Sequence, residues 1–120
     1  MDEYSVPARV EVDASRSITD YLVDHARTSP GRVLIEEPVD GQWVPRDAAW
    51  VLAEVEQLAK GLIAAGVGPG DRVGIMSRTR MEWTLADYAI WHAGAVPVPV
   101  YETSSPGQTQ WILADSEAVA

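Results

Sequence analysis

The sequence contains no cysteine, and this absence excludes disulfide bonds, thiolate nucleophiles and thiolate metal ligands. A chain without disulfides fits a reducing compartment, so we expect the protein to be cytoplasmic. Phenylalanine is also absent, although five tryptophans and four tyrosines are present. The tryptophans are spread over several segments, which favours a role in a core or an interface over a stacking platform for bases.

Basic residues are few, because nine Lys and Arg stand against 18 Asp and Glu and give a formal net charge of −9. Proteins that bind nucleic acid or an anionic membrane surface neutralise phosphates with clustered Lys and Arg, so both partners are disfavoured. The longest uncharged run, residues 88–101, is shorter than the roughly 20 apolar residues of a spanning helix. We therefore expect no transmembrane segment, and any contact of the parent protein with a membrane to be peripheral.

Capping residues and apolar periodicity predict four helices, at residues 18–28, 48–65, 80–93 and from 106 onward. The residues expected to cap them are Ser17, Asp47, Thr79 in a capping box with Glu82, and Ser105 in a capping box with Gln108. One apolar stripe on the second helix consists of Val51, Val55, Leu58 and Leu62. The third helix is apolar on most sides, which predicts extensive burial.

Short β-type runs lie between these helices. The runs at 32–37 and 42–46 flank an Asp-Gly pair and predict an antiparallel hairpin, with a loop longer than the tightest type. The runs at 72–76 and 95–100, with a further strand beginning at 118–120, alternate with helices and predict parallel strands. The fold class is therefore α/β, a hairpin followed by a β-α-β-α-β unit that is incomplete at its C-terminus.

The segment 66–71, GVGPGD, crowds three glycines and a proline in front of an apolar run. A phosphate-binding loop follows a strand and opens a helix, so that amides at the helix N-terminus face the anion. This segment does the reverse, because it closes one helix and opens a strand. No Gly-Lys-Ser/Thr follows it either. We interpret it as a turn, in which Gly66 ends the helix and Gly70-Asp71 leads into the strand.

The opposite edge of the predicted sheet carries polar side chains after two strands, and ligands of open α/β sheets bind at that carboxyl edge. Residues 77–80 follow one strand and residues 101–105 follow the next. Arg78, Tyr101 and Thr103 are the candidate ligand-binding residues. For Thr79, Glu82 and Ser105, helix capping is the alternative to ligand contact.

Other polar residues carry less functional signal. His25 and His92 are far apart in sequence and lack a third ligand at metal-binding spacing, so we expect no metal site. Asp87, inside an apolar helix, fits a satisfied polar group better than a catalytic acid. Ser77 and Ser104 lack the G-x-S-x-G context of an activated serine. The residues alone thus assign no catalytic group.

Several short pieces occur together in a characteristic order. LAKGLIAAGV leads into GPGDRV, and EW at 82–83, AGAV at 93–96, PVY at 99–101 and ILADS at 112–116 follow. Over residues 17–120 the chain resembles the N-terminal region of adenylate-forming (AMP-binding) enzymes, most closely long-chain fatty acyl-CoA synthetases. The resemblance implies two segments, an extended lead-in at 1–16 and the N-terminal portion of a truncated synthetase domain at 17–120.

The resemblance also implies a reaction for a longer parent enzyme. Such enzymes activate a fatty acid with ATP and Mg²⁺ to an acyl-adenylate and pyrophosphate, and then transfer the acyl group to coenzyme A. The family's Ser/Thr/Gly-rich phosphate loop lies downstream of this region, and the single lysine here, Lys60, is not at a reactive position. No catalytic residue is carried over, and the segment alone is predicted to be inactive and to bind none of these cofactors.

Two hypotheses about function follow. In the first, the chain is part of an acyl-CoA ligase whose partners are the remainder of the synthetase and a fatty acid substrate. In the second, it is a self-contained, non-catalytic α/β binding or interaction module. The first predicts an unpaired sheet edge and an apolar surface on the isolated segment, and hence self-association.

Overall fold

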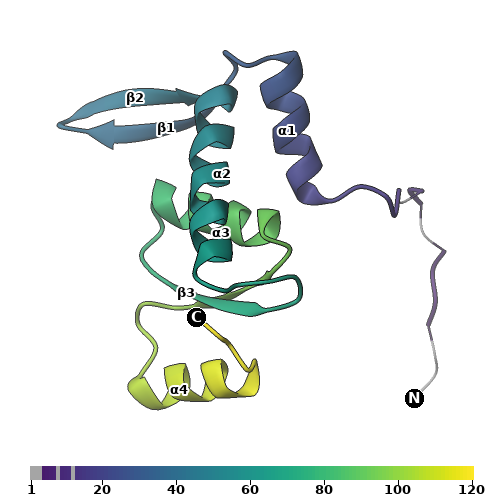
Figure 1. Cartoon of the computed structure of the whole chain (residues 1–120), viewed down its shortest axis with the longest axis vertical. Coiled ribbons are helices and arrows are strands. Elements are labelled where there is room, and N and C mark those ends of the chain that lie inside the picture. The colour runs from purple at the N-terminus through teal and green to yellow at the C-terminus, as the bar shows by residue number, and fades with distance from the viewer. Residues whose placement is uncertain (1–3, 8, 12) are drawn as a thin grey trace.

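The computed structural model describes residues 4–7, 9–11 and 13–120. The elements, in chain order, are α1 (Ile18–Thr28), β1 (Val33–Val39), β2 (Gln42–Asp47), α2 (Ala48–Ala64), β3 (Arg72–Met76), α3 (Met81–His92), β4 (Val96–Val100) and α4 (Pro106–Asp115). The described residues before 17 contain neither helix nor strand. Figure 1 shows the hairpin at one end of the molecule and α4 at the other, with α2 and α3 between them.

The hairpin is tighter than the sequence predicts. β1 and β2 pair antiparallel up to Val39 and Gln42, so only Asp40 and Gly41 form the loop. Both loop residues have a positive φ, 49° for Asp40 and 78° for Gly41. Two consecutive positive φ values define the two-residue turn that matches strand twist, and Asp-Gly is a preferred sequence for it. The expectation of a longer loop was wrong because Pro38 and Val39 are still part of the first strand.

The hairpin runs directly into α2, because Asp47 is both the last residue of β2 and the N-cap of the helix. Its carboxylate accepts a hydrogen bond of 2.9 Å from the backbone N–H of Trp50, as the sequence predicts. At the other end, Gly66 has a φ of 99° and stops the helix. The helix therefore begins and ends where its capping residues indicate.

β3 and β4 form a parallel pair in register from Arg72 opposite Val96 to Met76 opposite Val100. The Val96 N–H donates to Asp71 O over 2.7 Å, so the even-numbered residues of β4 face β3. Pro97 and Pro99 therefore turn their missing donors toward the outer edge of β4, where the described residues form no ladder. The helix α3 connects the two strands as a crossover, which confirms the predicted β-α-β unit.

α4 begins at the predicted capping box, since Ser105 N–H donates to Gln108 Oε1 over 2.9 Å. After α4 the chain returns to the free edge of β3, where Val119 N–H donates to Arg72 O and Gly74 N–H donates to Ala120 O. These two bonds do not make residues 118–120 a strand, so that expectation was wrong. Gly74 allows the close approach, because a Cβ there would lie 2.9 Å from Leu113 Cδ2.

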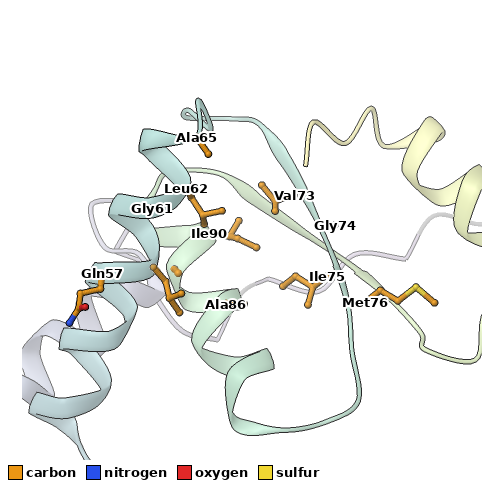
Figure 2. Close-up of a pocket in the computed structure, with 12 residues that line it drawn as sticks. Gln57, Gly61, Leu62, Ala65, Val73, Gly74, Ile75, Met76, Ala86 and Ile90 are labelled. Carbon is orange, nitrogen blue, oxygen red and sulfur yellow. The ribbon is translucent and has the colours of Figure 1, made fainter.

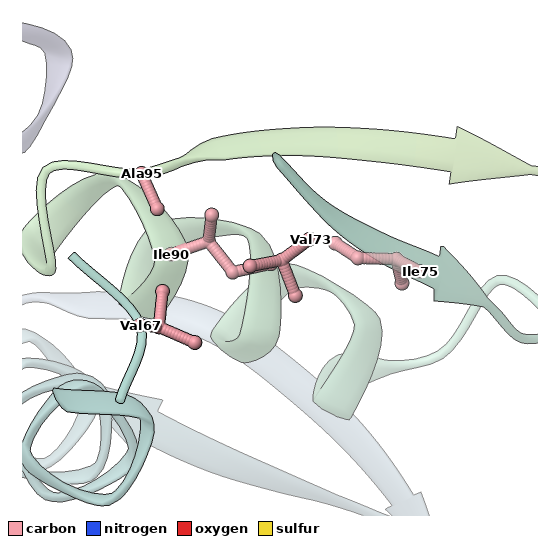
Figure 3. Close-up of a cluster of buried hydrophobic side chains, with 5 residues drawn as sticks. All are labelled: Val67, Val73, Ile75, Ile90 and Ala95. Atoms are coloured by element: carbon pink, nitrogen blue, oxygen red, sulfur yellow. The ribbon is translucent and has the colours of Figure 1, made fainter. Parts of the chain in front are cut away.

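Two clusters of buried side chains form the core. The helical cluster joins α1, α2 and α3 and consists of Leu22, Val51, Val55 and Leu85. The sheet cluster consists of Val67, Val73, Ile75, Ile90 and Ala95, and Figure 3 shows these side chains between α3 and the parallel strands. Fully burying one such aliphatic side chain stabilises the fold by about 1.5–3 kcal/mol. α3 contributes to both clusters, which accounts for its apolar character on most sides.

One residue of the predicted stripe on α2 departs from this arrangement. Leu58 is 45% exposed, although Val51 and Val55 on the same stripe are buried. Leu58 lines an open groove between α2, α3 and β3, which no described element fills. Periodicity identifies the apolar face of a helix but not how far along the helix a covering element reaches.

Candidate functional site

A pocket of about 560 Å³ lies at the carboxyl edge of the β3–β4 pair. Its lining residues are Ser77, Arg78, Thr79, Trp83, Pro99, Val100, Tyr101, Glu102 and Thr103. The pocket exists because Met76 and Val100 are register partners, so the loops that follow the two strands start side by side. Trp83, in the first turn of α3, closes one wall. The result is a hollow with an apolar base and a polar rim, as in many ligand sites.

All three residues singled out from the sequence line this pocket: Arg78, Tyr101 and Thr103. Arg78 Nε lies 3.5 Å from Glu102 Oε2, so an ion pair joins the two loops across the rim. The Arg78 side chain is 85% exposed and Tyr101 is 84% exposed. Their exposure leaves these groups available to a ligand. Whether they bind one stays a prediction.

Sequence reasoning did not assign Trp83 to the site. It treated the tryptophans as core or interface mass, and Trp83 does pack its half-buried ring against the sheet cluster. Its place in the first turn after the loop 77–80 was the signal that could have identified it. Arg80, in that same loop, lines a different hollow on the hairpin side.

The predicted capping box of Thr79 and Glu82 does not form at the start of α3. The N-cap is Arg80, not Thr79, and it has no side-chain capping bond. Glu82 instead accepts two hydrogen bonds from the guanidinium of Arg80, one of them 2.6 Å long from Nε. These bonds lower the pKa of the Glu82 carboxyl to about 2. An arginine fork competes better for a carboxylate than a single backbone amide does, which explains why no capping box forms. Thr79 is thereby left to line the pocket.

The glycine turn at the amino edge is built differently. The Gly68 N–H donates to Asp71 Oδ2 over 2.8 Å, and the Gly70 N–H donates to Gly94 O over 2.9 Å. Gly70 has a φ of 83° and Gly94 a φ of 77°. Amides that already serve internal acceptors cannot also bind a phosphate. The geometry is that of a turn, as interpreted from the sequence.

A second large hollow, of about 490 Å³, lies between α2, α3 and β3. Figure 2 shows Leu62, Val73, Ile75 and Ile90 lining this groove, with Gln57 at its margin. Gln57 is the one polar side chain in its wall. Ligand sites combine an apolar wall with several convergent polar groups, so the carboxyl-edge pocket is the better candidate for chemistry.

Among other titratable groups, Asp87 is 9% exposed, and burial raises the pKa of its carboxyl. Its carboxylate is not among the buried side-chain atoms that lack a hydrogen-bond partner within the described residues, and the expectation of a satisfied polar group stays a prediction. The described part of the chain holds no cluster of three or more His, Cys, Asp or Glu able to ligate a metal ion. In that same part, no helix is both long and apolar enough to cross a membrane.

The hairpin and the parallel β-α-β unit together have the fold of the N-terminal part of an adenylate-forming ligase. A family model described as AMP-binding enzyme matches residues 22–120, so the chain belongs to the AMP-binding enzyme family. A long-chain-fatty-acid–CoA ligase of Mycobacterium tuberculosis is 44% identical over 119 residues, which cover 99% of this chain and 20% of that protein. A fatty acyl-CoA synthetase of Dictyostelium discoideum is 32% identical over 65% of this chain and 11% of its own length.

Solved structures agree on the fold. A putative long-chain-fatty-acid CoA ligase from Rhodopseudomonas palustris has a TM-score of 0.75 and 30% identity over 86% of this chain and 25% of its own. A fatty acyl-adenylate ligase from Legionella pneumophila, solved with acyl adenylate and pyrophosphate, has a TM-score of 0.78 and covers 86% of this chain and 19% of its own. At 23% identity, the latter shows the fold alone. The chain spans about a fifth of the length of the mycobacterial ligases that are 44% identical to it.

Proposed function

We propose that this chain is the N-terminal portion of a long-chain fatty acid–CoA ligase. Such an enzyme converts ATP and a fatty acid to an acyl-adenylate and pyrophosphate, and then transfers the acyl group to coenzyme A. The observation that carries the proposal is the 44% identity to the mycobacterial ligase, which extends over 99% of this chain. The preference for long acyl chains and the use of Mg²⁺ belong to the proposal.

Within that enzyme, we assign the carboxyl-edge pocket to a substrate-facing surface. Arg78 supplies a cation for a carboxylate or phosphate, and Tyr101 and Thr103 supply hydroxyls that donate or accept hydrogen bonds. The placement of all three on one polar rim supports this assignment. Any role of Arg78 requires the ligand to compete with Glu102 for the guanidinium.

The described residues provide neither a ligand set for Mg²⁺ nor a loop of free backbone amides for the phosphates of ATP. They include no cluster able to ligate a metal. The amides of Gly68 and Gly70 in the glycine turn are already bonded to internal acceptors. We therefore assign no chemical step to this chain, and the partner that would supply the phosphate loop and the reactive lysine is the remainder of a longer synthetase.

The activity test compares two proteins. The 120-residue chain is expected to give no palmitate-dependent exchange of pyrophosphate into ATP above a blank. The longer protein that contains it is expected to show the exchange and to form palmitoyl-CoA. Exchange by the 120 residues alone would contradict the assignment of chemistry to other segments. A longer protein with no carboxylate-dependent exchange would favour the non-catalytic module.

The pocket is tested by substitution in that longer enzyme. Arg78→Gln is expected to raise the KM for one anionic substrate about tenfold, because a charge-assisted hydrogen bond contributes about 1.5–3 kcal/mol. Arg27→Gln is the matched control, since Arg27 is a surface arginine in an ion pair on α1, away from the pocket. If Arg78→Gln and Arg27→Gln changed the KM equally, Arg78 would not be a ligand-binding residue.

A further inference from the structure

A separate pocket of about 300 Å³ lies where α1, β1, α2 and α3 meet. Its lining residues are Tyr21, Leu22, His25, Leu34, Ile35, Val51, Val55, Thr84, Leu85 and Tyr88. None of them lines the carboxyl-edge pocket, so the two hollows are independent. Four different elements enclose the space, and no part of its wall depends on the residues assigned to ligase function.

The wall of this pocket is fixed by packing. Leu22, Val51, Val55 and Leu85 are at most 5% exposed, so the floor is the helical cluster itself. The guanidinium carbon of Arg16 lies 4.5 Å from the centroid of the Tyr21 ring and holds this ring from outside. On the other side, the Tyr88 ring packs edge-on against Trp91, with centroids 5.3 Å apart. The rim is thus positioned by contacts that lie outside the pocket.

Four side chains with hydrogen-bonding groups stand around this apolar floor: Tyr21 and His25 from α1, and Thr84 and Tyr88 from α3. Within the described residues, Tyr88 and His25 accept hydrogen bonds only through main-chain oxygens, from His92 Nδ1 and Ser29 N–H. Their side-chain polar atoms remain available. Few convergent polar groups on an apolar wall are the usual anatomy of a small-molecule site.

We propose that this pocket binds a small neutral molecule with a compact apolar body and one hydroxyl or carbonyl group. The size follows from the volume, because an apolar cavity of roughly 150 Å³ accepts a benzene ring and this pocket is about twice as large. Neutrality follows from the wall, where His25 is the only basic side chain and no carboxylate lines the space. Asp24, which precedes His25 on α1, is already paired with Arg16 and Arg27.

The proposal is tested with phenol and toluene as probes, by following side-chain methyl signals in the NMR spectrum of the protein. Phenol is expected to shift the methyl signals of Leu22, Val51, Val55 and Leu85 in a saturable way. Val67 and Ala95 of the sheet cluster line neither this pocket nor the groove beside β3, so they serve as an internal control and are expected to move little. A purely apolar pocket would bind toluene more tightly than phenol. The polar side chains at the rim predict that phenol binds at least as tightly as toluene. Toluene binding tenfold tighter than phenol, or equal shifts in both clusters, overturns the proposal.

A pair of threonine substitutions sharpens the test. Thr84→Met fills the mouth of the pocket and removes a hydroxyl, so the Kd for phenol should rise at least tenfold. Thr28→Met, at an exposed position on α1 outside the lining, should leave the Kd unchanged within a factor of two. His25→Leu provides a second variant should Thr84→Met fail to fold, and should weaken phenol while sparing toluene. Unchanged phenol binding in a folded pocket variant contradicts the assignment. The readout is independent of ligase activity.

Discussion

The two edges of the β3–β4 pair use their residues in opposite ways. At the amino edge, Gly68, Gly70 and Gly94 form a turn whose amides and carbonyls bond to one another and to Asp71. At the carboxyl edge, Arg78 and Tyr101 extend into solvent around a pocket. One edge is closed by its own backbone, and the other presents side chains.

This difference explains why we do not expect the glycine-rich segment to bind phosphate. Glycine allows the positive φ values that the turn requires, but it contributes no side chain and here no free amide. Loop residues after parallel strands tolerate variation without loss of the scaffold, and ligands of open α/β sheets bind there. Substitutions at the amino edge should therefore cost stability, and those at the carboxyl edge should not.

The largest effect is expected for Gly94→Ala. Gly94 has a φ of 77°, and a Cβ there would lie 3.3 Å from Pro69 Cβ, closer than ordinary van der Waals contact. The positive φ alone costs an L-residue about 1–2 kcal/mol, and the contact adds to it. We expect a loss of about 2–3 kcal/mol in the free energy of unfolding, measured by urea denaturation. A loss below about 1 kcal/mol would show that the amino edge tolerates side chains.

A smaller loss, of about 1–2 kcal/mol, is expected for Gly70→Ala, because its φ is 83° but no atom lies within 4 Å of an added Cβ. Gly68→Ala is the matched control, since it has no positive φ and its Cβ would meet Asp71 Oδ2 at an ordinary 3.7 Å. In a longer ligase, the affinity for ATP should stay nearly unchanged in both variants. If Gly70→Ala weakened ATP binding and left the Tm unchanged, the glycine turn would have to be considered a nucleotide-binding segment.

The sequence predicted the amino edge well because glycine, proline and capping residues act locally. Such signals predict both ends of α2, the glycine turn that follows it, and the positions of β3 and β4. The three candidate residues of the carboxyl edge do share a pocket, and their role in binding stays a prediction. The sequence did not predict every residue that lines this pocket. Trp83 lines it because of how α3 packs, and Thr79 lines it because Arg80 pairs with Glu82 and no capping box forms at Thr79.

Whether a predicted apolar residue is buried also depends on segments that are distant in the sequence. Leu58 lies on the predicted apolar face, yet it is exposed because no described element covers the groove beside β3. Residues 118–120 reach β3 with two hydrogen bonds but form no strand. In both cases the local pattern indicates a preference, and the contacts that realise it come from elsewhere in the structure.

A pH titration tests how the carboxyl edge is organised. The bonds from Arg80 hold the pKa of Glu82 at about 2, below its ordinary 4.5. A lowered carboxyl pKa stabilises the fold above the unfolded-state pKa, and this contribution is lost as the pH falls through the folded-state value. Following the Glu82 carboxyl carbon by NMR should give a midpoint near 2, and Arg80→Gln should return it toward 4.5. An unchanged midpoint in Arg80→Gln would show that the pair does not set this pKa.

The smallest effect on stability is expected for Arg78→Gln, and it separates the two edges most clearly. The Arg78–Glu102 pair spans 3.5 Å, and its side chains are 85% and 50% exposed. Exposed pairs contribute about 0–1 kcal/mol, because water and salt screen the charges. Urea denaturation should therefore give a change below about 0.5 kcal/mol, with Glu102→Gln behaving alike. Glu82 should keep its low pKa in Arg78→Gln, since a different arginine sets it. A loss of unfolding free energy as large as that of Gly94→Ala would mean that Arg78 helps to hold the fold together. That result would contradict the proposal that the carboxyl edge faces a ligand.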